Sequence, residues 1–85
     1  MDPQDFRNYI EEKVLDVIEN GLETETISLE RAQQLSDLVL NSLKEDLNVD
    51  QLYVTIQQLK YKAPELSTII LEILDYYDEQ KKGSF

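Results

Sequence analysis

PELSTIILEILDYY, residues 64–77, is the stretch that decides the fold. Its apolar residues recur at intervals of three and four, the spacing that places them on one face of an α-helix. Pro64 ends a preceding helix but fits the first turn of a new one. The stretch therefore predicts an amphipathic helix over residues 64–81, and its apolar face comprises Leu66, Ile69, Ile70, Ile73, Leu74 and Tyr77.

Three further segments with the same periodicity precede Pro64, and each begins after a residue suited to an N-cap. Asp2, Ser28 and Asn48 carry side-chain oxygens that can accept a hydrogen bond from the first turn of a helix. The pattern therefore predicts three more helices, over about 3–20, 29–46 and 49–61.

The connection between the first two predicted helices contains one of the two glycines. Gly21 is expected to end the first helix in the left-handed conformation. Ile27 precedes the second helix and is expected to pack against Ala32 as a hydrophobic staple. The apolar stripe predicted for the second helix is Leu29, Ala32, Leu35, Val39 and Leu43, widened by Leu38 and Leu40.

The four segments predict one all-α domain over residues 1–85. A chain of this length has too little core for a second domain. Its short connections favour antiparallel packing of neighbouring helices. We therefore expect a compact antiparallel bundle of four helices, the third being the shortest.

Composition narrows the functions that remain open. The chain lacks histidine, cysteine and tryptophan, and 18 acidic residues face 8 basic ones, for a net charge of −10. No nucleophile–base pair, metal-ligand set or phosphate-binding loop is evident, so we expect a protein that is not an enzyme and takes no cofactor. The negative charge repels nucleic acid and anionic membranes, so neither is expected as a direct partner.

Two further features concern location and charge distribution. The first five residues lack the basic and apolar regions of a secretory signal, and the longest apolar run is Ile69-Ile70-Leu71, so we expect a cytoplasmic protein that spans no membrane. Residues 1–46 carry 12 acidic and 4 basic residues, whereas residues 47–85 carry 6 and 4. A partner with a basic face would therefore be attracted first to the N-terminal half.

Several apolar or aromatic residues fall outside the main stripes and are the candidate partner-binding residues. If they converge, they form a patch for a protein partner or for a second copy of the chain. Otherwise each is an isolated exposed apolar residue, which is common on protein surfaces. The candidates are Leu15, Val54, Tyr61, Leu71 and Tyr76. They predict a small acidic interaction module of the adaptor or regulatory kind, able to self-associate.

An alternative function is mimicry of nucleic acid, in which acidic residues occupy the basic groove of a partner. Mimicry needs a row of carboxylates on one exposed face. Part of such a row is present in Glu11, Glu12, Asp16, Glu19 and Glu23, although Arg7 and Lys13 are expected to interrupt it.

A minor alternative is a degenerate EF-hand-like calcium site over residues 46–57. Asp46, Asn48 and Asp50 match the opening of an EF-hand loop. Gln51 stands where the loop needs glycine, and Gln57 stands where it needs a bidentate carboxylate. The favoured interpretation is that these residues cap and begin a helix, with no metal bound.

A carrier-protein function is also weighed, because acyl carrier proteins are small, acidic and four-helical. Their modified serine begins a helix, whereas Ser36 follows Leu35 in the middle of one. Ser36 is better interpreted as a small residue at a close approach of two helices.

Three segments together resemble a family of small acidic helical proteins from bacteria, a domain of unknown function. They are Ile27-Ser28-Leu29-Glu30-Arg31-Ala32, Leu52-Tyr53 and Pro64-Glu65-Leu66. The resemblance covers most of the chain and implies an all-helical fold. It implies no activity, ligand or site residue.

Overall fold

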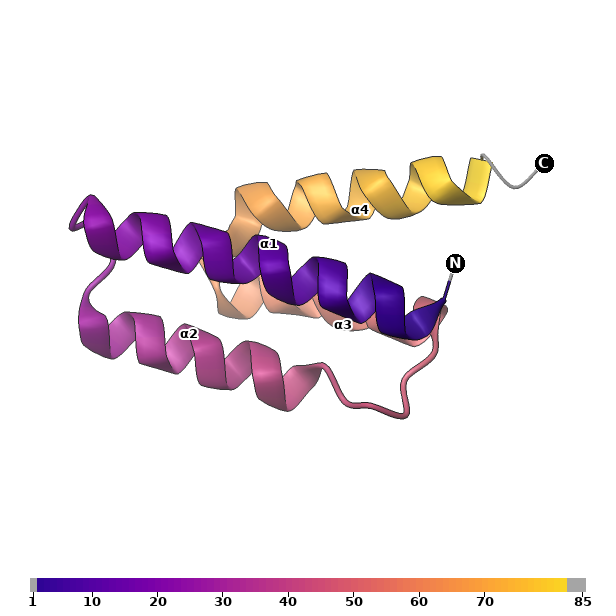
Figure 1. The fold of residues 1–85 in the computed structure, drawn as a ribbon, viewed down its shortest axis with the longest axis horizontal. Coiled ribbons are helices and arrows are strands. Elements are labelled where there is room, and N and C mark those ends of the chain that lie inside the picture. The colour runs from indigo at the N-terminus through magenta and orange to yellow at the C-terminus, as the bar shows by residue number, and fades with distance from the viewer. Residues whose placement is uncertain (1, 83–85) are drawn as a thin grey trace.

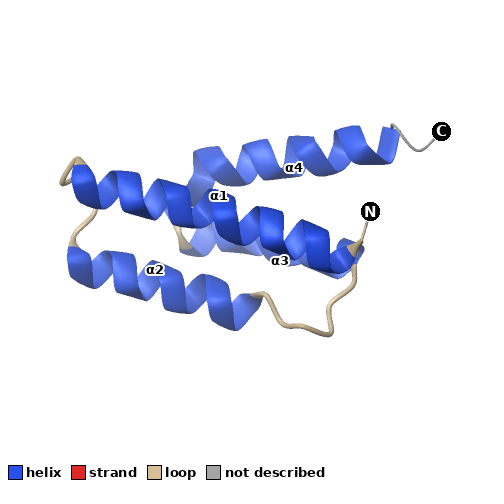
Figure 2. Cartoon of the chain, viewed as in Figure 1, coloured by secondary structure: helices blue, strands red, loops and turns tan. Residues whose placement is uncertain are grey.

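The computed structural model describes residues 2–82, which form four α-helices and one short 3-10 turn. The elements are α1 (Pro3–Glu23), α2 (Leu29–Ser42), α3 (Val49–Lys62), the 3-10 turn η1 (Pro64–Leu66) and α4 (Ser67–Lys82). Figure 2 shows helices joined by short loops, with no strand among the described residues. The prediction of an all-α fold with four helices is confirmed.

The helices are arranged around α1. In Figure 1 successive helices run in alternating directions along the long axis of the molecule. α1 contacts α2, α3 and α4, and α3 also packs along α4. α2 has α1 as its main partner. α2 is therefore the helix with the least tertiary cover.

One hydrophobic core joins all four helices. Each helix turns a stripe of apolar residues inward, as the three- and four-residue spacing requires. Burying one leucine, isoleucine or phenylalanine side chain stabilises the fold by about 1.5–3 kcal/mol. The largest fully buried side chains are Phe6, Ile10, Leu35, Leu52, Ile56, Leu66, Ile70 and Ile73.

The predicted helix starts are confirmed by their capping hydrogen bonds. The side chains of Asp2 and Ser28 accept hydrogen bonds from the backbone N–H groups of Gln4, at 2.7 Å, and Arg31, at 3.1 Å. Asn48 accepts from the N–H of Gln51 at 2.8 Å, and the Gln51 side chain accepts from the N–H of Asn48 at 2.9 Å. This reciprocal pair is a capping box.

The predicted end of the first helix is wrong. α1 continues through Gly21 to Glu23, and the backbone of Gly21 is not left-handed. The left-handed residue is Glu25, with φ of 58°. A Cβ atom on Gly21 would lie 2.4 Å from Cδ1 of Ile27. The lack of a side chain at Gly21 therefore lets Ile27 pack closely against α1 at the α1–α2 turn.

The predicted end of the second helix is also wrong, and a buried arginine binds the chain just beyond the observed end. α2 ends at Ser42, four residues before the expected 46. The Arg7 side chain is buried, and its guanidinium donates to the backbone oxygens of Lys44, at 3.0 Å, and Glu45, at 2.7 Å. These contacts fasten the α2–α3 connection to α1. α2 and α3 have 14 residues each, so the third helix equals the second in length, and the expectation that it is the shortest is not confirmed.

The fourth helix begins in two steps. Pro64 starts the turn η1, whose backbone is 3-10, and the α-helical geometry begins at Ser67 and continues to Lys82. Ala63, fully buried between α3 and η1, allows the chain to reverse against the core. The expected single helix over 64–81 is therefore a 3-10 turn followed by α4.

Candidate functional site

The exposed large hydrophobic residues fall on two separate pairs of helices. On α1 and α2 they are Leu15, Leu29 and Leu40, with exposed fractions of 48%, 76% and 61%. On α3 and α4 they are Val54, Tyr61 and Leu71, with exposed fractions of 49%, 83% and 49%.

The structure does not gather the five predicted partner-binding residues into one patch. Leu15 borders a groove between α1 and α2, whereas Val54 and Tyr61 border a hollow between α3 and α4. Leu71 is exposed on α4 and lines neither. Tyr76 is half-buried, and its ring stacks on Tyr9 with centroids 4.0 Å apart. Tyr76 therefore joins α4 to α1.

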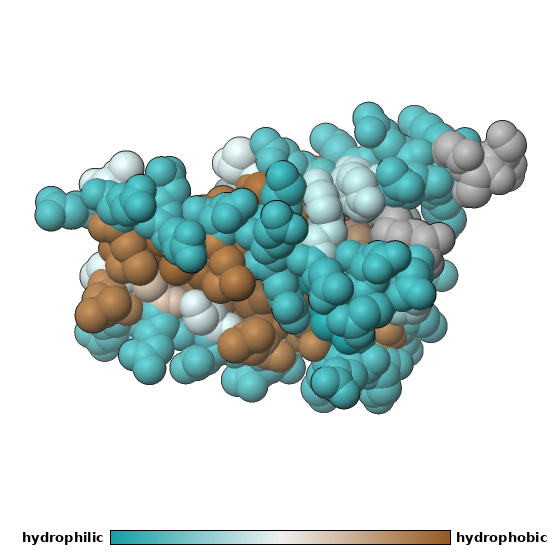
Figure 3. All heavy atoms as spheres, viewed as in Figure 1, coloured by the Kyte–Doolittle hydropathy of each residue, from teal (hydrophilic) through white to brown (hydrophobic). Residues whose placement is uncertain are grey.

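The concave feature between α1 and α2 is a groove lined mainly by apolar side chains. Its floor is formed by buried apolar side chains and its two edges by Leu15 and Leu40. Figure 3 shows apolar side chains gathered on the visible face over α1 and α2. The residues that line the groove are Glu11, Val14, Leu15, Ile18, Ser36, Val39 and Leu40.

Helical spacing explains why the lining residues of each helix lie on one face of it. Residues 11, 15, 18 and 22 share one face of α1, and residues 29, 33, 36 and 40 share one face of α2. Ser36 is the smallest side chain in the lining, so it leaves space between the two leucine edges. The expectation that Ser36 lies at a close approach of two helices stays a prediction, since Ser36 lines a groove here.

Leu29 and Leu40 are corrections to the predicted core. Both were expected on or beside the buried stripe of α2, but they are among the most exposed apolar residues. Leu29 is the first residue of α2, and Ile27 occupies the core at that end instead. The overlooked signal is that Leu29 and Leu40 share a face of α2 with the polar residues Gln33 and Ser36.

Acidic residues flank the groove on both sides. Glu11 lies in its wall. Glu12 and Glu19 are exposed one turn on either side of Leu15, and Asp37 is exposed one turn before Leu40. The groove is therefore apolar along its centre and negative at its edges.

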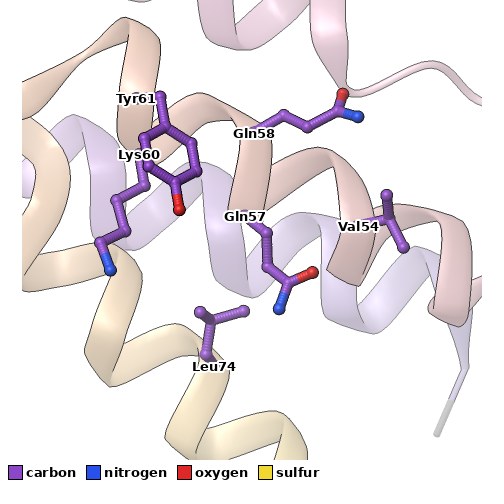
Figure 4. A pocket seen from close by; sticks show the side chains of 6 residues that line it. All are labelled: Val54, Gln57, Gln58, Lys60, Tyr61 and Leu74. Atoms are coloured by element: carbon purple, nitrogen blue, oxygen red, sulfur yellow. The ribbon is translucent and has the colours of Figure 1, made fainter.

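The α3–α4 hollow is larger and more polar. It has a volume of about 370 Å³, within the ~300–1,000 Å³ of small-molecule sites. Figure 4 shows Gln57, Lys60 and Tyr61 extending from α3 toward the side where Leu74 of α4 lies. Tyr61 is 83% exposed, so a molecule placed there would keep one side in water. The hollow is a surface depression that does not enclose a ligand.

The minor alternative, an EF-hand-like calcium site at residues 46–57, is not compatible with the helix that most of these residues form. α3 begins at Val49, so most of the proposed loop has helical backbone. Asn48 and Gln51 are engaged in the capping box, and Asp50 accepts a hydrogen bond from the Tyr77 hydroxyl at 2.5 Å. These side chains stabilise a helix start.

An ion pair holds the N-terminal end of α2. The Arg31 guanidinium makes two hydrogen bonds to the Glu65 carboxylate of η1, one of them at 2.9 Å. The hydrogen bonds from Arg31, helped by the Glu65 backbone, lower the pKa of the Glu65 carboxyl to about 2. Arg31 and Glu65 come from two of the segments that carry the family resemblance, and their role here is structural.

A second polar contact closes the opposite end of the bundle. Tyr77 is buried against Phe6 and Tyr53, with ring centroids 5.7 and 4.5 Å away. The hydrogen bond to Asp50 raises the pKa of Tyr77, and burial of the phenol acts in the same direction. Lys81 also donates to the Tyr77 hydroxyl at 3.3 Å. The cluster ties α4 to α1 and α3.

The described residues offer neither a cluster of metal-binding side chains nor a membrane-spanning helix. Residues 2–82 hold no group of three or more acidic side chains placed to bind a metal ion. Within the same residues, no helix has both the length and the hydropathy needed to cross a membrane.

Comparison with known proteins adds no assignment beyond the fold class. No family model matches the chain, and neither the curated proteins nor the solved structures include a significant match. The molecule is an all-α four-helix protein, and its resemblance to small acidic bacterial proteins stays a prediction.

Proposed function

We propose that this chain is a small cytoplasmic protein-interaction module, without catalytic activity, that binds a protein partner in the α1–α2 groove. The observation that carries the proposal is the position of Leu15 and Leu40 on opposite edges of an apolar floor. Apolar surface gathered in a concave strip and bordered by charge is typical of protein interfaces.

The shape of the groove favours a protein over a small molecule. Its free volume is about 30 Å³, far below the ~300–1,000 Å³ of small-molecule sites. A space of this size accepts the tip of a side chain. A partner that covers the groove would place such a side chain between Leu15 and Leu40, and would remove both leucines from water.

Capture from the cells that express the chain tests this proposal. Three baits are compared: the natural chain, the double variant Leu15→Ser/Leu40→Ser, and the control Val54→Ser. Val54 is a matched control because its exposed fraction, 49%, equals that of Leu15 within 1%. We expect a partner that the natural chain and the Val54 variant retain and that the double variant loses at least tenfold.

Circular dichroism checks that the variants are folded. We expect no loss of folding, since exposed substitutions usually change stability by less than about 0.5 kcal/mol. A partner that the groove variant retains and the Val54 variant loses would move the site to the α3–α4 hollow. Retention of no protein by the natural chain would contradict the proposal.

Mimicry of nucleic acid is the second candidate, and one observation favours it. Glu12, Asp16, Glu19 and Glu23 are all exposed and lie at helical spacing along α1. Arg7 was expected to interrupt this row, but it is buried against the α2–α3 connection. The row is therefore less broken than the sequence indicated.

Charge removal distinguishes the two candidates. The variant Glu12→Gln/Asp16→Asn/Glu19→Gln keeps Leu15 and Leu40. Under mimicry, it loses a basic partner as completely as high salt does, and the leucine variant keeps that partner. Under the groove proposal the leucine variant has the larger effect.

A further inference from the structure

We infer that the occupant of the α1–α2 groove is a basic amphipathic helix of the partner, with apolar anchors three or four residues apart and lysine or arginine on both flanks. The inference rests on the function proposed above and specifies the chemistry of the partner.

The geometry of the groove fits a helix. Two neighbouring helices form its walls, and a third helix packs into such a seam by placing its side-chain ridges between theirs. Beyond the lining residues, the same helix faces carry Leu22 on α1 and Leu29 on α2, with the exposed Gln33 between Leu29 and Ser36. Residues 11–22 of α1 rise about 16 Å at 1.5 Å per residue, which is the length of three helical turns. The seam is thus long enough for three turns of a helix, one of whose apolar anchors would enter the space between Leu15 and Leu40 while its neighbours at i±3 or i±4 lie along the seam.

α2 is also the helix that lacks cover. Its inner side contacts α1, whereas Leu29 and Leu40 on its outer side remain exposed. Two polar contacts from elsewhere hold its ends, Arg7 at the C-terminal side and the Arg31–Glu65 pair at the N-terminal side. Because these contacts fix α2 without covering its outer face, the groove is formed before a partner binds.

The charges around the groove select the sign of the partner. Residues 11–42 carry eight acidic and two basic residues. Both basic residues are engaged elsewhere: the Nζ of Lys13 lies 5.6 Å from the Tyr9 ring centroid, and Arg31 binds Glu65. Neither basic residue of this stretch therefore neutralises the carboxylates that an occupant would meet, which are those of Glu11, Glu12, Glu19 and Asp37. A helix with basic flanks is complementary to them.

The same charges disfavour a second copy of the chain as occupant. In a symmetric dimer through this groove, the acidic edges of one copy would meet the acidic edges of the other. Like charges brought together at an interface oppose association. The expectation that the chain self-associates is therefore not assigned to this groove.

Titration with designed peptides tests the inference on the full chain. The first peptide is a helix of about 16 residues with leucines at i, i+3 or i+4, and i+7 and lysines on both flanks. The second has glutamate in place of each lysine. The third is a scramble of the first, which keeps its charge but disperses the leucines. Binding is measured by fluorescence anisotropy, and the contacted residues are located by amide chemical shifts.

The expected result is that the lysine peptide binds at least tenfold more tightly than the other two. Its binding should weaken as salt rises, because salt screens the exposed carboxylates. Shift changes should gather at residues 11–18 and 36–40. Ser36→Leu, which fills the space between the leucine edges, and Leu40→Ser should each weaken binding about tenfold, whereas Val54→Ser should leave it unchanged.

Five results would overturn the inference. Equal binding of the lysine and glutamate peptides would remove the role of charge, and equal binding of the scramble would remove the helix. Shift changes on α3 and α4 would place the helix elsewhere. Concentration-dependent dimerisation that Leu40→Ser abolishes would make a second copy the occupant. If no peptide binds while a cellular partner still depends on Leu15 and Leu40, the inference fails and the proposed function stands.

Discussion

The α1–α2 half and the α3–α4 half of this molecule expose similar numbers of large apolar side chains but form different surfaces. Leu15 and Leu40 border a strip whose floor is apolar, whereas glutamines and a lysine separate Val54 from Tyr61. The N-terminal half also holds most of the net negative charge. The comparison shows that the residues between exposed apolar side chains decide whether they form a continuous apolar strip.

The two halves also differ in how their outer helix is held. α4 is fixed by an aromatic cluster, in which Tyr77 packs on Phe6 and Tyr53. α2 depends on its apolar seam with α1 and on polar contacts at its two ends. Changes in the aromatic cluster should therefore act on the whole fold, and changes at the ends of α2 should act mainly on α2.

Phe6→Ala should have the largest effect, because Phe6 is fully buried and joins α1 to Tyr77 of α4. Truncating a buried phenylalanine costs about 3–5 kcal/mol of unfolding free energy. Urea unfolding followed by circular dichroism measures the loss. The matched control is Tyr61→Ala, which removes an 83% exposed ring and should cost less than about 0.5 kcal/mol. Equal losses would mean that the halves do not share one core.

Arg7→Met should come second and should act mostly on α2 and the connection after it. The variant removes a buried donor from the carbonyl groups of Lys44 and Glu45. Hydrogen bonds to a charged group contribute about 1.5–3 kcal/mol. Amide exchange should become faster across residues 39–48 than across α4. Uniform acceleration in all helices would contradict a local role.

Gly21→Val should cost somewhat less, about 1–3 kcal/mol, because the added side chain overlaps Ile27. Leaving glycine returns a few tenths of a kcal/mol of helix propensity. Adding Ile27→Ala to Gly21→Val should restore part of the loss, so the two changes should be less than additive in a double-mutant cycle. Full additivity would show that the glycine is not required by this contact.

Glu65→Gln should have the smallest effect, and the effect should depend on pH. The Glu65 carboxyl has a pKa of about 2 in the fold, below its ordinary 4.5, so its pairing with Arg31 stabilises the fold above pH 4.5. That contribution is lost as pH falls through about 2, when the folded carboxyl is protonated. The difference in unfolding midpoint between the natural chain and the variant should therefore be present at pH 7 and vanish near pH 2. A constant difference would contradict the pairing.

The sequence predicts the local elements well, because their causes lie within a few residues. Asp2, Ser28 and Asn48 begin helices where expected, since a cap and the turn that it stabilises are neighbours in the chain. The helix ends are less predictable. α2 ends at Ser42, four residues early, and the connection after it is held by Arg7, which is far away in sequence.

The candidate site was predictable only in part. Leu15, Val54, Tyr61 and Leu71 were correctly identified as lying outside the buried stripes, and all four are exposed. Their distribution over two surfaces could not be deduced, because it depends on which helices are neighbours. Leu40 was assigned to the core because a helical wheel cannot show how wide a face the neighbouring helices cover.

By itself, the sequence determined the helical class, the helix starts, the net charge and the absence of histidine and cysteine chemistry. These properties follow from periodicity, capping and composition, which act locally or are sums over the chain. The tertiary structure alone decided that Ile27 packs against Gly21 and that Arg7 binds the α2–α3 connection. It also decided that Leu15 and Leu40 lie on opposite edges of one groove. Each of these depends on two helices packing at a particular register, which contacts distant in sequence select.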